Sequence, residues 1–154
     1  MKIFFTILTI TILLTGCATR NAFSKLGMTV EQELALENTK SGKMQSEEIV
    51  GGVYSSIYMN NVSSKIDKKY ITFYVSVYLK NQSKNLKITM NTQNPLEIKE
   101  LALDNEYAHL LSKTSEWSKN YLVSFENNAS SEVNLLIESG QFSSGQLNYL
   151  KDLR

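Results

Sequence analysis

The stretch that decides the fold is YITFYVSVYLK, residues 70–80. Apolar side chains occupy every second position from Ile71 to Leu79, and Tyr, Thr or Ser occupies the positions between them. Successive side chains of a β-strand point to opposite faces of the sheet, so this period of two predicts a strand. The apolar positions are expected to face the protein core.

Shorter segments with similar alternation lie on both sides of this stretch. Further strands are predicted over residues 53–59, 86–90, 96–103, 107–111, 121–125, 133–137 and 147–150. The Asn127-Asn128 pair predicts a hairpin that joins residues 121–125 to residues 133–137. Short strands joined by polar turns are typical of a sandwich. We therefore expect an all-β domain over residues 51–154, a β-sandwich of seven to eight antiparallel strands, with a small β-barrel as the alternative.

The N-terminus has the pattern of an export signal. Lys2 precedes a short apolar run over residues 3–14, which is below the roughly 20 residues that a membrane-spanning helix needs. Leu14-Thr15-Gly16-Cys17 follows directly. This tetrapeptide resembles the lipobox of bacterial prolipoproteins. The resemblance implies cleavage of residues 1–16 as a signal peptide and diacylglycerol on the Cys17 sulfur, which anchors the chain in a membrane. Ala18, in place of Asp, favours the outer membrane.

The strand-rich part carries a second resemblance. In Val75-Ser76-Val77-Tyr78-Leu79-Lys80-Asn81-Gln82-Ser83 an alternating strand runs into an Asn-x-Ser turn. This pattern, together with the strand count, is similar to small immunoglobulin-like domains of bacterial lipoproteins. The resemblance implies an immunoglobulin-like sandwich, although the Cys pair and buried-Trp signature of antibody domains are missing.

Residues 17–50 are predicted to form the lipidated Cys and a flexible tether. The segment is polar and has few aromatic residues, so it offers little apolar surface to bury. Thr29 and Gln32 have the spacing of a capping box, which predicts a short helix that ends near Asn38. The apolar stripe of this helix is thin, so a marginal helix within a disordered tether is expected.

Composition excludes several classes of protein. The chain has 154 residues, with 16 basic and 15 acidic side chains, so it lacks the basic excess of a nucleic-acid-binding surface. A single Cys and a single His argue against a disulfide framework and against a structural zinc site. His109, in a predicted strand, is expected to be a surface or half-buried histidine. No metal and no cofactor are expected.

Two features are candidate sites on the folded domain. Tyr70, Tyr74 and Tyr78 share one face of the central strand, where they are expected either to pack against neighbouring strands or to form an exposed platform for a protein or glycan partner. The segment Glu126–Ser130 matches the acid-x-Asn-x-Ser glycosylation pattern of some bacteria, and it places Asn128 in the predicted hairpin turn.

These observations favour a non-enzymatic, membrane-anchored lipoprotein. We expect a binding or structural module at the outer membrane or cell surface, attached through the lipid on Cys17, with a protein or glycan partner and no nucleic acid. Two alternatives stay open. One is a periplasm-facing assembly accessory, such as a pilotin-like or envelope-complex subunit. The other is a periplasmic enzyme or an enzyme inhibitor.

Overall fold

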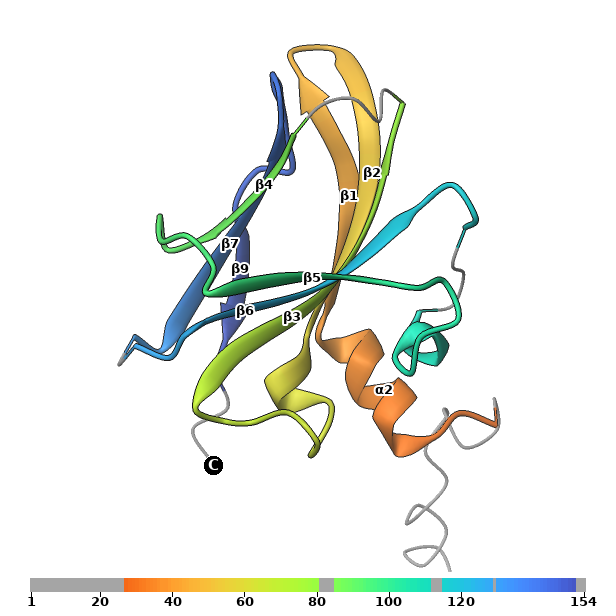
Figure 1. The fold of residues 1–154 in the computed structure, drawn as a ribbon, viewed down its shortest axis with the longest axis vertical. Helices are drawn as coiled ribbons and strands as arrows, with labels where there is room; N and C mark the ends of the chain where they lie inside the picture. The colour runs from red at the N-terminus through yellow and green to blue at the C-terminus, as the bar shows by residue number, and fades with distance from the viewer. Residues whose placement is uncertain (1–26, 81–84, 112–114, 129, 152–154) are drawn as a thin grey trace, which may run out of the picture.

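A single antiparallel sheet, curled into a half-barrel, dominates the structure (Figure 1). This computed structural model describes residues 27–80, 85–111, 115–128 and 130–151. Within these residues the strands are β1 (Thr39–Ser46), β2 (Ile49–Tyr58), β3 (Tyr70–Leu79), β4 (Leu86–Met90), β5 (Glu97–Leu101), β6 (Lys119–Glu126), β7 (Glu132–Ser139), β8 (Phe142–Ser143) and β9 (Leu147–Leu150). Helix α2 (Val30–Glu37) and the 3-10 helices η3 (Met59–Asn61) and η4 (Ala108–Leu110) complete the described elements.

The curl of the sheet brings strands from its two ends around one core. The strand order is β4-β7-β8-β1-β2-β3-β6-β5, and β9 also pairs with β7. The curl turns β4, β7 and β9 toward β2, β3 and β6, so the concave face encloses the main core. The strands thus form one hydrogen-bonded sheet, and the all-β prediction is confirmed at this level. The strand pairing shows one continuous sheet and does not show two separate sheets.

The alternation of β3 has the predicted effect on the concave face. Ile71, Phe73, Val75 and Val77 are buried in the main core. The Phe73 ring lies against three other rings, with centroid distances of 5.4 Å to Tyr58, 6.2 Å to Phe125 and 5.2 Å to Tyr149. These aromatic contacts join β3 to β2, β6 and β9.

A second apolar cluster covers the convex face. Ala35 of α2 and Leu110 of η4 pack over Ile57 of β2 and Tyr74 of β3. Both faces of β3 are therefore buried along most of the strand.

The polar segment before residue 50 is largely part of the folded domain. The capping box is present, because Thr29 and Gln32 exchange hydrogen bonds at the start of α2. Residues 39–46 form β1, which pairs with β2 along its whole length. The expected flexible tether is therefore wrong for residues 29–50. Backbone hydrogen bonds and one fully buried side chain, Met44, hold β1 in place despite its polar sequence.

Two further local predictions are wrong. Strands β6 and β7 do not pair with each other, because β6 lies between β3 and β5 while β7 pairs with β4, β8 and β9. After β6 the chain leaves its partner β3 and crosses to the other side of the half-barrel, where β7 begins. At the start of this connection the Asn127 side chain donates a hydrogen bond to the Lys68 carbonyl. Residues 107–111, predicted as a strand, contain the 3-10 helix η4, which places Leu110 in the convex cluster.

Gly51 and Gly52 lie inside β2, where neighbouring groups leave no space for a side chain. A Cβ atom on Gly51 would lie 2.4 Å from the Phe142 ring, and one on Gly52 would lie 2.3 Å from the Tyr78 carbonyl oxygen. Glycine thus lets β8 and β3 approach the β2 backbone closely.

Candidate functional site

The half-barrel is open along a seam between its two edge strands. Among the described residues, β4 pairs only with β7 and β5 pairs only with β6, so β4 and β5 do not close the sheet into a barrel. Ile98 of β5 lies opposite the core residue Val123 in the sheet register, yet 43% of its surface is exposed. Apolar side chains on the concave side of the seam are therefore accessible from solvent.

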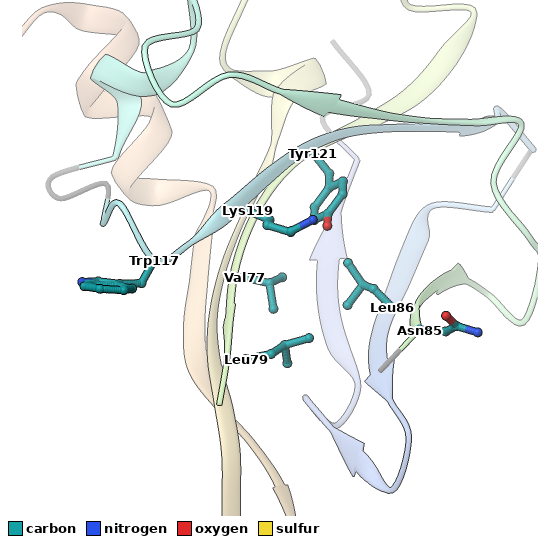
Figure 2. Close-up of a pocket in the computed structure, with 7 residues that line it drawn as sticks. All are labelled: Val77, Leu79, Asn85, Leu86, Trp117, Lys119 and Tyr121. Atoms are coloured by element: carbon teal, nitrogen blue, oxygen red, sulfur yellow. The ribbon is translucent and has the colours of Figure 1, made fainter. Parts of the chain in front are cut away.

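A cleft opens at one end of this seam (Figure 2). Val77 and Leu79 of β3, Leu86 of β4 and Tyr121 of β6 point into a shared space from three strands. Asn85, Lys119 and Trp117 complete the lining, and the Trp117 ring is turned outward, with 69% of the residue exposed. The cleft has apolar walls and a polar and aromatic rim.

The charges at the rim are paired. Lys119 Nζ lies 3.3 Å from Glu100 Oε1, and both side chains are about half exposed, so water screens the pair. Burial, and then the nearby Glu100 carboxylate, raises the pKa of Tyr121. The Tyr121 phenol is therefore neutral at physiological pH and adds a hydroxyl to the polar groups of Asn85 and Lys119 around the apolar walls.

The size of the cleft limits its ligand. Its volume is about 180 Å³, whereas pockets for small molecules and cofactors occupy roughly 300–1,000 Å³. The cleft therefore fits one or two apolar side chains of a protein better than a cofactor.

The three strand tyrosines do not form the exposed platform considered from the sequence. Tyr74 has no exposed surface, packs against Tyr107 with ring centroids 6.0 Å apart, and accepts a 3.2 Å hydrogen bond from Asn105 Nδ2. Tyr70 and Tyr78 are half-buried. Tyr74 instead packs within the domain, which was the alternative prediction for this face of the strand.

Asn128 lies in the connection between β6 and β7 and is half-buried. Its Oδ1 atom is buried and has no hydrogen-bond partner within the part of the chain that the structure describes, and its backbone carbonyl accepts from Lys151 Nζ. The expected hairpin turn is absent, because β6 and β7 do not pair. Glycosylation of Asn128 stays a prediction.

His109 takes part in a cluster that sequence analysis did not identify. Its Nε2 atom lies 3.5 Å from Glu31 Oε2, and its backbone carbonyl accepts a 3.1 Å hydrogen bond from Gln32 Nε2. A hydrogen bond from Ser63 lowers the pKa of Glu31, with smaller contributions from His109. In a Ser-His-acid triad the imidazole stands between the other two groups. Here the carboxylate does, so the cluster joins α2 to η4 and does not activate the serine.

No group of three or more His, Cys, Asp or Glu side chains suited to a metal ion occurs among the described residues. In the same residues no helix is both long and apolar enough to cross a membrane. Cys17 lies outside the described residues. Comparisons with protein-family models, with curated proteins and with solved structures find no match to this chain.

Proposed function

We propose that this chain is a lipid-anchored binding module. The lipobox at Leu14–Cys17 supplies the anchor, and the half-barrel domain binds a protein partner. The cleft between β3, β4 and β6 carries the proposal, because it presents apolar side chains to solvent in the geometry of a pocket.

Aromatic anchors that insert into small pockets supply much of the binding energy at protein interfaces. The cleft is of that size, and Trp117 at its rim is itself exposed. Exposed Leu96 and Ile98 extend the apolar surface along the seam. These features support a non-enzymatic role, either as a binding module at the outer membrane or as a subunit of a periplasm-facing complex.

We also propose an immunoglobulin-like fold for the domain. In this proposal β4-β7-β9 and β2-β3-β6 correspond to the two layers of an immunoglobulin-like sandwich, and β8 connects them. The shared concave core supports this correspondence. Amide hydrogen exchange tests it against a closed barrel, in which the outer edges of β4 and β5 would both be protected.

The anchor is tested with Cys17→Ser in cells fed a labelled fatty acid. We expect the label and detergent-phase partitioning to disappear. Membrane partitioning equal to that of wild type would refute lipidation at Cys17. Protease treatment of intact cells then distinguishes the cell surface, where the domain is cleaved, from the periplasmic face, where it is protected.

The cleft is tested by photocrosslinking in living cells. A photoreactive phenylalanine analogue replaces Trp117 at the rim, and the matched control carries it at exposed Glu48, in the turn between β1 and β2. We expect an adduct of one defined mass from position 117, weakened by Leu86→Glu. Equal adducts from both positions, or none from position 117, would contradict the proposed surface.

A further inference from the structure

The sheet is joined at one end of β1 and separated at the other. Strand β8 pairs with β7 through Glu138 and Ser139 and reaches β1 only at Gln45. Strand β9 lies farther along the same side of β7 and pairs with it through residues 132–135. In the described part of the chain β9 has no pairing with β1, so a gap remains between them (Figure 1).

The outer edge of β1 presents unpaired backbone groups to this gap. Tyr58 N–H donates to the Asn38 carbonyl, and the register continues as Lys40↔Ser56 and Gly42↔Tyr54. In an antiparallel ladder alternate residues direct their N–H and C=O groups to opposite sides. Even-numbered residues therefore bond to β2, and Thr39, Ser41 and Lys43 direct their groups away from it.

Strand β9 presents the matching edge. Lys151 N–H donates to the Ser131 carbonyl, so Tyr149 and Leu147 bond to β7 by the same alternation. The backbone groups of Asn148 and Leu150 point away from β7. The Leu150 carbonyl receives a long 3.5 Å contact from Asn61 Nδ2, and no hydrogen bond to the Asn148 backbone is found on this side among the described residues.

A groove of about 470 Å³ occupies the gap, and we call it the β1–β9 groove. Its lining includes Leu34, Lys40, Asn61, Asn148, Leu150 and Lys151. Leu150 is 74% exposed, although it is apolar and lies in a strand. Two strand edges that lack a backbone partner among the described residues, beside an exposed leucine, are the features of a site for strand addition.

The groove has a small excess of positive charge. Lys40 and Lys151 line it together with one carboxylate, Glu37, and neither lysine forms an ion pair with a described carboxylate. The Lys151 ammonium donates instead to Asn127 Oδ1 and to the Asn128 carbonyl, so Lys40 is the lysine left to face a partner. Lys40 Nζ lies 5.5 Å from the centroid of the Tyr149 ring. Lys40 and Tyr149 are on the concave side of their strands, whereas Leu150 is on the convex side.

We propose that the β1–β9 groove binds an extended, acidic peptide segment of a protein partner. The segment adds as a strand between β1 and β9, with backbone hydrogen bonds to both edges. Its side chains alternate, so an acidic residue faces Lys40 while its neighbours in sequence cover Leu150. This site lies on different strands from the cleft and does not depend on the proposed role of the cleft.

The test is selection from a phage-displayed library of random decapeptides on the full-length chain in detergent. The Ser41 N–H points away from β2, so Ser41→Pro removes it without breaking a hydrogen bond to β2, and this change blocks strand addition. Ser41→Ala is the control for loss of the hydroxyl. We expect enriched peptides rich in Asp and Glu, an affinity at least tenfold weaker for Ser41→Pro than for Ser41→Ala, and unchanged affinity for Trp117→Ala. Lys40→Glu should reverse the charge preference.

Amide exchange provides a second measurement on the unaltered chain. A selected peptide should slow exchange at Ser41, Lys43, Asn148 and Leu150. No enrichment, equal binding by Ser41→Pro and Ser41→Ala, or unchanged exchange at these amides would overturn the proposal. Self-association that Ser41→Pro abolishes would also overturn it, because the groove would then hold a second copy of this chain.

Discussion

The Tyr149 hydroxyl donates a 3.0 Å hydrogen bond to the Ser56 backbone carbonyl, and this bond joins two strands that are 93 residues apart in the chain. Tyr149 belongs to β9 and Ser56 to β2, and these strands are not neighbours in the sheet. The bond crosses the concave core and ties the two sides of the half-barrel together at the floor of the β1–β9 groove.

Tyr149→Phe tests the value of this bond. The change removes only the hydroxyl, and a buried hydrogen bond contributes about 0.5–1.5 kcal/mol to stability. We expect the free energy of unfolding to fall by that amount, so that the denaturant midpoint decreases while the slope is unchanged. The control is Tyr70→Phe, whose ring is only half-buried. Equal losses in the two variants would show that the Tyr149–Ser56 bond does not stabilise the fold.

The face assignment of β3 is tested by Phe73→Ala against Thr72→Ala. Both residues are buried, but Phe73 contacts three rings on the concave side, while Thr72 Oγ1 lies 3.4 Å from Ser124 Oγ on the convex side. Removing a core phenylalanine costs about 3–5 kcal/mol. We expect Phe73→Ala to lower the melting temperature far more, and similar shifts would mean that the concave core is not the main source of stability.

The sequence predicts strands well where apolar side chains alternate with polar ones and the apolar ones are buried. The expected segment 86–90 is identical to β4, and β3 spans all but the last of residues 70–80. Strand β1 was missed because only Met44 of its side chains is fully buried, so its sequence has no apolar alternation. Its position depends on backbone hydrogen bonds to β2, and these bonds do not require particular side chains that a sequence pattern could show.

Pairing partners and sites were harder to predict because they depend on contacts between distant segments. The hairpin of β6 and β7 was predicted from the Asn127-Asn128 turn between two alternating segments, but β6 instead pairs with β3 and β5. Tyr74 was a candidate surface residue because tyrosine suits both surfaces and cores, and its burial depends on the convex cluster, which includes Tyr107. The cleft requires the strand order itself, since Leu79, Leu86 and Tyr121 resemble ordinary core residues in sequence.

Ser63→Ala tests the cluster that joins α2 to η4. The Ser63 hydrogen bond is the largest influence that lowers the Glu31 pKa, ahead of the charge and hydrogen bond of His109. We therefore expect the Glu31 pKa to rise in Ser63→Ala when the carboxyl carbon is titrated by NMR. An unchanged Glu31 pKa in Ser63→Ala would show that the serine does not stabilise the carboxylate.

Alkaline pH should destabilise the domain through its buried tyrosines. Burial raises the pKa of Tyr149 most, and also raises the pKa values of Tyr54, Tyr58, Tyr74, Tyr107 and Tyr121. The folded state then holds these protons more tightly than the unfolded state. This contribution to stability is complete below the unfolded-state pKa of about 10 and is lost as the pH rises toward the folded-state values.

The expected free energy of unfolding is therefore insensitive to these groups up to about pH 9 and falls above pH 10, by about 1.4 kcal/mol per pH unit for each proton held only by the folded state. Equilibrium urea unfolding between pH 8 and pH 12 measures this slope. Tyr149→Phe should make the decline shallower, because it removes the most strongly shifted phenol. If the free energy of unfolding fell equally steeply in wild type and in Tyr149→Phe, the loss of stability at alkaline pH would not come from the Tyr149 phenol.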